Sequence, residues 1–494
     1  MKLMRLHIVQ LLLIALFVLP VVTSCYNYDQ EENVVYSEAA ANYINVTISV
    51  SASDNAFTRA MPNGGEYGDE TLKGDNRENE VKNITLIFYQ DATGINTTSD
   101  ESEVVSVQRY VVRPVTDSDK LTANDEHGHK VTEPGSDYYG KEVLYTTGNQ
   151  KLEGTGLVKG ETYKMLVVAN ASYVDVNVGD KIKTNGTNIG LRDKVIDNVF
   201  TGTGIGTNAT DFVMVSETDA EVTLDEPDDI ETTSNETSLI YYFPCIHIER
   251  LAARIDFDTT GGTYYENTGV SGYKYVMGGD IFILTSVTPF NLYNEDEYLF
   301  KRVQEAWPAT ATTYLGDETT ETHATLTKVA NNYVVDPHTA GKDNTHTFSY
   351  LNPIAASMNS GYSHSTTTDQ GSIITLCYSK ENTLMPTSQL KKYATGIAFT
   401  GEYYPSGIDG PHTTRTYYHY IRHQGDKTEA ETYKAKQWDE LTDEETSTAN
   451  IPMNIGIVRN NIYRISIKGD GEGTLKVEVQ ETKWRHVDNP VIYI

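Results

Sequence analysis

Few clusters in this chain combine residue types that could do chemistry. His127 and His129 stand beside Asp125 and Glu126, a set that could chelate a metal. Structural zinc needs a fuller and more widely spaced ligand set, so a solvated loop is favoured here. Glycines alternate with other residues over 202–206, but no helix follows whose N-terminus could hold a phosphate. These clusters predict no catalytic residue, no metal ligand and no cofactor.

Carboxylates are abundant but unspecific. The acidic run 225–229 could bind calcium, although it lacks the spaced pattern of an EF-hand. His419 and His423 are four residues apart, but the surrounding sequence is typical of a strand, so helical spacing does not apply. The sequence contains no G-x-S-x-G, HExxH or Walker motif. We therefore expect that the protein is not an enzyme, with a glycosidase carboxylate pair left open.

The first residues predict the compartment. Lys2 and Arg5 precede an apolar run over 8–19, which is too short to span a bilayer and is typical of a signal peptide at residues 1–24. Small residues lead into Cys25, an arrangement that resembles the bacterial lipobox and implies lipidation of that cysteine. Two or three acyl chains such as palmitate would hold an outer-membrane lipoprotein precursor. The alternative is an ordinary secretory signal with an incidental cysteine.

Composition bounds the partners and the number of domains. The chain has 494 residues and a formal net charge of −30, and a surface this acidic repels phosphate backbones. A nucleic-acid partner is therefore not expected. The length predicts two or three domains. Cys245 and Cys377 could form a disulfide in an oxidising compartment or stay free thiols, and their spacing does not decide between these.

Strand patterns dominate the rest of the sequence. Between Tyr43 and Ser51 the side chains alternate strictly, which predicts a strand with one buried face. The face expected to be buried consists of Ile44, Val46, Ile48 and Val50. Further strands are expected at 81–89, 103–112, 163–170, 211–216, 221–224, 254–257, 373–378, 395–403, 416–421, 461–467 and 474–481. Short helices are expected at 191–200, 296–307 and 438–446. Many short strands with few short helices indicate an all-β chain built of β-sandwiches.

The domain organisation follows from these patterns. A lipidated propeptide at 25–59 would carry the first strand. A Thr-, Asp- and Glu-rich stretch at 217–238 is interpreted as a long loop near the domain boundary. We expect an N-terminal sandwich at 60–245 and a C-terminal sandwich at 246–494 that carries a donor-strand tail at about 474–494.

Several segments resemble the major fimbrial subunit (fimbrillin, type V pilin) family of Bacteroidota, in particular its minor-fimbrium branch. They are Glu78–Phe88, Tyr163–Asn170, Glu249–Phe257, Ile421–His423 and Ile457–Tyr463. Their order covers the chain almost from Cys25 to its end, except for about 264–368. The resemblance implies two tandem transthyretin-like, Greek-key β-sandwich domains in a fimbrial subunit.

The resemblance also implies proteolytic processing. In that family a trypsin-like surface protease cuts after an arginine that follows the first strand. Here Arg59, followed by Ala60, stands in that place, with Lys73 and Arg77 as later candidates. The alternative is an uncut surface arginine. A cut would detach the lipid and the first strand, leaving an apolar trough with unpaired backbone groups that recruits another strand.

Two C-terminal segments could fill that trough by donor-strand addition. Leu475, Val477 and Val479 alternate as the first strand does, but this segment could equally complete its own domain. The second segment contains Val491, Ile492 and Ile494, and we expect it to be the better donor. A head-to-tail contact that does not close makes a filament.

The sequence thus predicts a subunit of a cell-surface fimbrium that supports adhesion. The expected partners are further copies of the chain, tip and anchor proteins, the protease, a host or bacterial surface ligand, and the membrane before processing. One alternative is a tip or anchor subunit or an adhesin. Another alternative is a surface glycan-binding lipoprotein that displays some of the 34 tyrosines.

Overall fold

The structure is a computed structural model. It describes residues 41–50, 72–73, 76–90, 102–115, 144–182, 188–191, 194–204, 208–216, 219–233, 236–267, 269–293, 296–300, 311–312, 326–327, 348–349, 354–355, 373–383, 394–421, 431–441 and 456–485. The expectation of an all-β chain is confirmed, because strands make up nearly all of the regular structure in these ranges. Their only helix is the short α2 (Asn76–Asn79). Within them, no helix is long and apolar enough to cross a membrane.

Two sheets form the N-terminal domain. The nine-stranded sheet contains, in this order across the sheet, β5 (Val104–Val111), β4 (Asn83–Tyr89), β9 (Thr162–Ala169), β11 (Met214–Ser216), β15 (Ile246–Arg250), β2 (Thr47–Ser49), β7 (Leu144–Thr146) and β6 (Arg113–Pro114). Strand β12 (Ala220–Thr223) also pairs with β9. The four-stranded sheet contains β13 (Asp229–Thr232), β14 (Thr237–Tyr242), β1 (Ala41–Asn45) and β8 (Gln150–Lys151). One apolar core draws on both sheets, as expected for a sandwich.

Two six-stranded sheets form the C-terminal domain. The first contains β26 (Ile373–Ser379), β16 (Ala253–Asp258), β32 (Asn461–Gly469), β33 (Leu475–Arg485) and β3 (Leu72–Lys73), with β30 (Glu431–Lys434) also on β33. The second contains β17 (Thr263–Asn267), β18 (Val270–Met277), β19 (Asp280–Phe290), β28 (Gly396–Tyr404) and β29 (Thr413–Tyr420), with β25 (Ile354–Ala355) also on β19. A second apolar core lies between these sheets.

Four short two-stranded ladders complete the described elements. They are β10 (Val195–Ile196) with β21 (Glu297–Tyr298), β20 (Leu292–Tyr293) with β24 (Phe348–Ser349), β22 (Ala311–Thr312) with β23 (Leu326–Thr327), and β27 (Asn382–Thr383) with β31 (Gly456–Ile457). All of them pair antiparallel.

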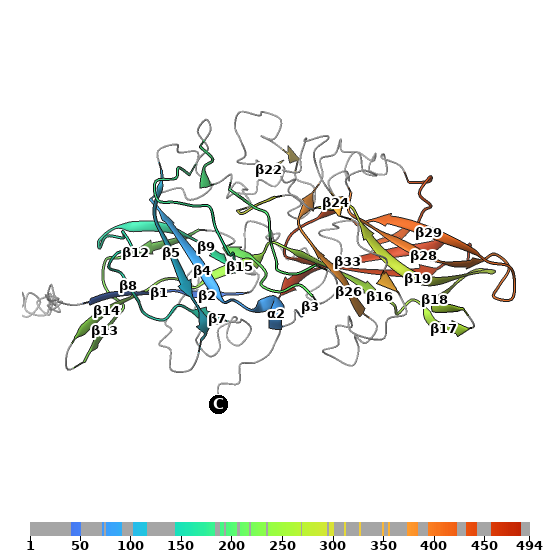
Figure 1. Ribbon diagram of the computed structural model, residues 1–494, viewed down its shortest axis with the longest axis horizontal. Helices are drawn as coiled ribbons and strands as arrows, with labels where there is room; N and C mark the ends of the chain where they lie inside the picture. The colour runs from blue at the N-terminus through green and yellow to red at the C-terminus, as the bar shows by residue number, and fades with distance from the viewer. Residues whose placement is uncertain are drawn as a thin grey trace, which may run out of the picture.

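The two domains lie side by side along the molecule, with α2 and β3 between them (Figure 1). The N-terminal core includes Ala252, whereas the neighbouring Ala253 belongs to the C-terminal core. Strand β15 therefore lies in the N-terminal domain, although a division at 245/246 would assign it to the second. Conversely, β3 pairs with β33 and so adds a piece of the N-terminal sequence to the C-terminal sheet.

The expectation of short helices is wrong in the part of the chain that is described. The stretches 191–200 and 296–307 each contribute a strand instead, and these strands, β10 and β21, pair with each other. Residues 438–440 form a turn. A hydrogen-bonded partner far away in sequence has overridden the weak local helical pattern in the first two stretches.

The expectation of a long loop at 217–238 is also wrong in large part. Besides β12, which matches the strand expected at 221–224, this stretch contains β13 and the start of β14. It belongs to the N-terminal domain rather than to the boundary, because β14 pairs with β1. Strand β13 lies at a sheet edge with mostly exposed side chains, so its sequence carries no apolar alternation that would have revealed it.

Candidate functional site

The first strand lies in the interior of the N-terminal domain. Strand β1 pairs parallel with β14 and antiparallel with β8. Strand β2 continues it, parallel to β15 and antiparallel to β7. We call the space that residues 41–50 occupy, between β14 and β15 on one side and β8 and β7 on the other, the first-strand slot. Removing these residues would leave two facing rows of strand backbone without partners.

The side chains in the slot are buried on both faces. Ile44, Val46, Ile48 and Val50 are 0% exposed and belong to the N-terminal core. The polar side chains between them are buried too, so the expectation of a single buried face is wrong: Asn45 is 8% exposed, Thr47 2% and Ser49 0%. Full burial follows from the central position of this segment, which has a paired strand on each side.

A polar contact point interrupts the apolar slot between β1 and β2. The Asn45 side chain donates from Nδ2 to Asn149 Oδ1 at 3.0 Å, and its Oδ1 accepts from the Thr146 hydroxyl at 2.8 Å. At the next residue, the Val46 N–H donates to the Thr147 hydroxyl at 3.1 Å. We call Asn45 and Val46 with these three partners the polar station.

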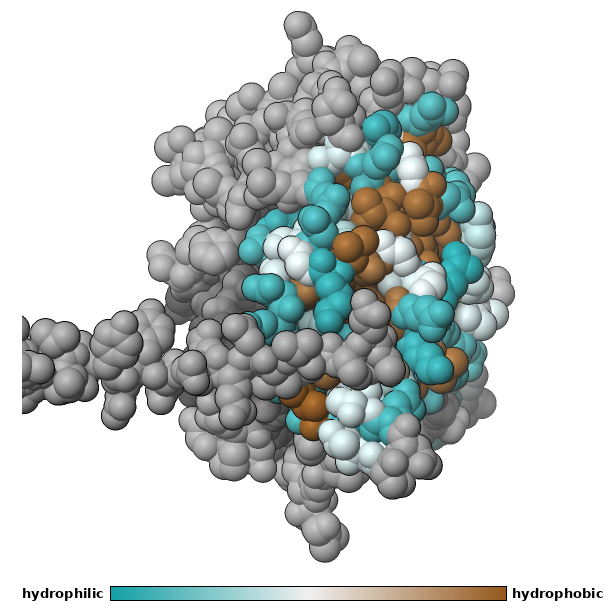
Figure 2. Space-filling view, turned by 90° about the vertical axis from the view of Figure 1, so that its left-hand side faces the viewer, coloured by the Kyte–Doolittle hydropathy of each residue, from teal (hydrophilic) through white to brown (hydrophobic). Residues whose placement is uncertain are grey.

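The slot begins beside a surface cavity of about 730 Å³. The cavity is lined by residues at the start of β1 and by the segment that follows β8, namely Ala41, Asn42, Lys151, Leu152, Glu153, Gly154, Gly156, Leu157, Val158 and Lys159. The Lys159 ammonium lies 5.8 Å from the ring centroid of Tyr241, a residue of β14. Figure 2 looks onto the end of the molecule formed by this domain and shows apolar residues gathered among polar ones.

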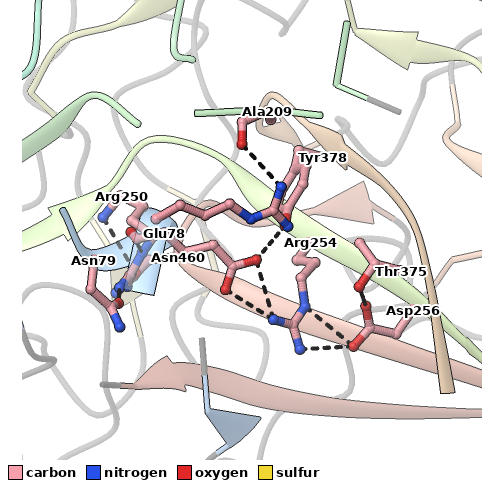
Figure 3. A network of polar contacts seen from close by, with 10 residues as sticks. Glu78, Asn79, Ala209, Arg250, Arg254, Asp256, Thr375, Tyr378 and Asn460 are labelled. Atoms are coloured by element: carbon pink, nitrogen blue, oxygen red, sulfur yellow. Dashed lines mark hydrogen bonds and ion pairs between the residues drawn. The ribbon is translucent and has the colours of Figure 1, made fainter. Parts of the chain in front are cut away.

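A buried polar network joins the two domains (Figure 3). The Glu78 carboxylate on α2 accepts from Arg254 Nη1 at 3.1 Å and from the Tyr378 hydroxyl. Arg254 also donates to Asp256 at 2.9 Å. Glu78 and Asp256 are fully buried and Arg254 is 2% exposed. These charges avoid the usual cost of burial because each has a partner of opposite sign.

Arg250, at the end of β15, forms the N-terminal part of the same network. It donates from Nε to the Glu78 carbonyl at 2.9 Å, from Nη2 to the Asn79 side chain, and from Nη1 to Asn460 Oδ1 at 3.3 Å. Burial lowers the pKa of Arg250 to about 10. Burial also acts to lower the pKa of Arg254, but the Asp256 and Glu78 carboxylates together raise it above its ordinary value.

Residues from three of the segments that resemble the fimbrillin family meet in this network. Glu78 begins the first, Arg250 and Arg254 lie in the third, and Asn460 lies in the last. Sequence reasoning did not identify these residues as a unit. The available signal was the presence of charged residues inside strand-like apolar runs, because such residues are rarely buried without a partner.

The segment 475–479 is part of its own domain. It begins β33, which forms a hairpin with β32 and also pairs with β30. Leu475 is 1% exposed, Val477 and Val479 are 0% exposed, and all three lie in the C-terminal core. Of the two interpretations left open for this segment, the structure shows the one in which it completes its own sheet.

The remaining expected sites divide into described and undescribed residues. Cys25, Arg59, Ala60, Val491, Ile492 and Ile494 lie outside the described ranges. Cys245 and Cys377 are separate, buried free thiols, and burial raises the pKa of Cys377 well above its usual range. In the described part of the chain, no group of three or more His, Cys, Asp or Glu side chains could hold a metal.

No protein-family model matches the chain, and no curated protein matches it. Solved structures with a similar fold include a candidate cell-adhesion protein from Parabacteroides distasonis, with 13% identity, a TM-score of 0.39, and coverage of 91% of this chain and 98% of the other. The tip fimbrial protein Mfa3 from Porphyromonas gingivalis has 11% identity and a TM-score of 0.34, over 90% and 99% of the two chains. Fimbrilin (FimA) from Porphyromonas gingivalis has 12% identity and a TM-score of 0.34, over 91% and 99%. Similarity at this level leaves the function to be argued from the strands of the chain itself.

Proposed function

We propose that the protein is a structural subunit of a cell-surface fimbrium that polymerises by donor-strand exchange. In this proposal the segment 41–50 leaves the first-strand slot and the C-terminal tail of another copy takes its place. The observation that carries the proposal is the pairing of β1 and β2, which are buried and hydrogen-bonded on both sides although they stand near one end of the sequence. A single cut behind them would sever their link to the domain they complete.

The slot would be an effective acceptor after such a cut. The four aliphatic side chains of the leaving segment are fully buried. Burying the three aliphatic side chains of the tail, Val491, Ile492 and Ile494, contributes roughly 5–9 kcal/mol, at about 1.5–3 kcal/mol for each. The ladder hydrogen bonds on both sides would be satisfied at the same time. An empty slot therefore favours capture of a strand over exposure to water.

The donor and the processing site follow from the same arrangement. Because Leu475, Val477 and Val479 fill their own core, the donor role falls to the tail that contains Val491, Ile492 and Ile494. Arg59 provides the basic residue that a trypsin-like surface protease needs. Arg77 is a poorer target, since its side chain donates to the Tyr378 hydroxyl and to the Ala209 carbonyl at the domain junction. Lipidation at Cys25 would hold the precursor on the outer membrane until the cut.

Limited trypsin digestion of the purified precursor tests this function. We expect a new N-terminus at Ala60, followed by ladders that resist SDS without boiling. Arg59→Ala is the matched control and should remain uncut and monomeric under the same conditions. A precursor that is cut at Arg59 but remains monomeric at high concentration would exclude polymerisation by strand exchange.

A further inference from the structure

We propose that the polar station sets the register of the incoming strand, and that Asn489 and Pro490 of a second copy occupy it. This inference rests on the proposed donor-strand exchange and specifies how the donor lies in the slot. In this register Asn489 takes the place of Asn45 and Pro490 takes the place of Val46. The tail then runs in the same direction as the strand that it replaces.

The first argument is the set of polar groups that the leaving strand exposes. When Asn45 departs, Asn149 loses the donor to its Oδ1 and the Thr146 hydroxyl loses its acceptor. Thr146 is buried and the new strand closes over it, whereas Asn149 is exposed and can bond to water instead. Leaving the buried Thr146 hydroxyl without its acceptor is costly, and an asparagine side chain in the same position restores both hydrogen bonds.

The second argument is the tolerance of the next position for proline. Proline has no N–H and is therefore excluded from most positions of a central strand. At Val46 the N–H donates to the Thr147 hydroxyl, and β1 and β2 are interrupted there. A proline at this position loses only a side-chain hydrogen bond. The hydroxyl of Thr147 keeps a partner, because it also donates to the Gly148 carbonyl at 2.9 Å.

The third argument is the sequence of the tail. Asn-Pro occurs in the chain only at 352–353 and 489–490. The first instance directly precedes β25, which pairs with β19 in its own domain. The second precedes Val491-Ile492-Tyr493-Ile494, so Ile492 and Ile494 take the places of Ile48 and Val50.

Other registers fit less well. A shift by two residues puts the proline at Ile44 or Ile48, within the paired parts of β1 and β2. A shift by one residue exchanges the two faces of the strand. Reversing the strand direction about Pro490 puts Asp488 at Ile48, beside the apolar Ile246, whereas the chosen register puts it at Ile44 of the same core but beside Tyr241.

The chosen register brings Asp488 to a position with polar groups nearby. It replaces Ile44, whose partner on β14 is Tyr241. Within the described residues, the Tyr241 hydroxyl is buried without a hydrogen-bond partner, and Lys159 lies over the Tyr241 ring. An aspartate on this face would be close to a hydrogen-bond donor and a cation. The replacement with the largest mismatch in size is Tyr493, which takes the place of the small, buried Ser49.

Disulfide trapping tests the register directly. In the proposed register Val487 takes the place of Tyr43, whose antiparallel partner is the exposed Lys151. Directly opposed residues in such a pair have Cα atoms about 4.5–5.5 Å apart, within the range that a disulfide spans. After the trypsin cut and mild oxidation, V487C with K151C should give ladders that survive boiling without reductant. The matched control is V487C with E153C, two residues away, which should give none.

The outcomes separate the register from the function. If ladders form but only V487C with E153C traps them, the register is wrong and strand exchange stands. If wild type and all variants stay monomeric after the cut, the proposed function fails and the register with it. As a second measurement, N489L should slow ladder formation about tenfold, because it leaves the buried Thr146 hydroxyl without its acceptor. Y493S should assemble at least as fast as wild type, and slower assembly of Y493S would contradict the register.

Discussion

At the scale of single residues, Glu78 is the side chain that most directly ties the two domains together. It stands on α2, between β3 in the C-terminal sheet and β4 in the N-terminal sheet. Its carboxylate contacts Arg254 and Tyr378, while its carbonyl accepts from Arg250. Arg250 ends β15, and β15 pairs with the first strand. One residue therefore connects the wall of the slot to the second domain.

Glu78→Gln is expected to destabilise the precursor by about 3–5 kcal/mol, because it removes one partner of a buried ion pair. Glu80→Gln is a matched control, since Glu80 is half exposed and pairs with Lys82 at 3.5 Å on the surface. An exposed pair of this kind contributes about 0–1 kcal/mol. Urea unfolding of both variants measures the difference. Equal stabilities would show that the Glu78 contacts contribute nothing beyond a surface pair.

These residue contacts could be predicted only in part from the sequence. Arg250 and Arg254 were not singled out in advance, although their place within a strand-like apolar run was an available signal. Their partner Glu78 lies 176 residues from Arg254 along the chain, and no local pattern relates the two. The alternation of Ile44, Val46, Ile48 and Val50, in contrast, predicted their burial correctly. A period-two pattern reports on the residues within one strand, not on the strands beside it.

At the scale of elements, the first strand and the strand at 475–485 have opposite roles. The first strand is proposed to leave the mature subunit. Strand β33 forms a hairpin with β32 and contributes to its own core, so it is expected to stay. Substitutions in the two strands should therefore affect the precursor and the polymer differently.

Ile48→Ala should destabilise the precursor by about 2–5 kcal/mol through loss of buried volume. It should leave the stability of the assembled polymer unchanged, because the altered strand is no longer present. Val477→Ala is the counterpart and should lower the melting temperature of both forms. Differential scanning calorimetry before and after assembly measures this. A polymer weakened by Ile48→Ala would mean that the first strand is retained.

The turn of the β32–β33 hairpin supplies a pH-dependent prediction. Asp470 accepts hydrogen bonds from the Thr474 hydroxyl, the Thr474 N–H and the Glu472 N–H, which together lower its pKa to about 2. A carboxyl pKa below the ordinary 3.8 stabilises the fold above that pH, and this contribution is lost as the pH falls toward 2. Asp470→Asn should therefore melt slightly below wild type at neutral pH, with the gap closing in acid. Glu472→Gln, in the same turn, should follow wild type, and a gap that widened in acid would contradict this.

Several of the longer strands, such as β4, β5, β9, β26, β28, β32 and β33, were predicted from the sequence, but β14, β15 and β17 to β19 and most of the short strands were not. The missed ones have physical reasons. Strand β19 has buried and half-buried residues in an irregular order, so it shows no clean period of two. Strand β13 is an exposed edge, and β10 and β21 depend on each other for their hydrogen bonds. Local pattern does not report such pairings.

At the scale of the whole molecule, the proposed acceptor slot lies in one domain and the tail follows the other, and the buried polar network joins the two domains. The slot lies in the N-terminal domain, while β33, which leads into the tail, lies in the C-terminal domain (Figure 1). A donor and an acceptor in different domains of an elongated subunit favour a head-to-tail contact that continues without closing. The buried network at the junction would keep successive contacts in line.

Mixing two blocked variants tests strand exchange most directly. Arg59→Ala keeps its own first strand and can only donate, whereas a trypsin-cut variant that ends at residue 486 can only accept. After trypsin is quenched, each should remain monomeric alone, and the mixture should give a heterodimer and nothing longer by light scattering. Polymers from either variant alone, or no heterodimer under conditions where the wild type forms ladders, would contradict the exchange of the first strand for the tail.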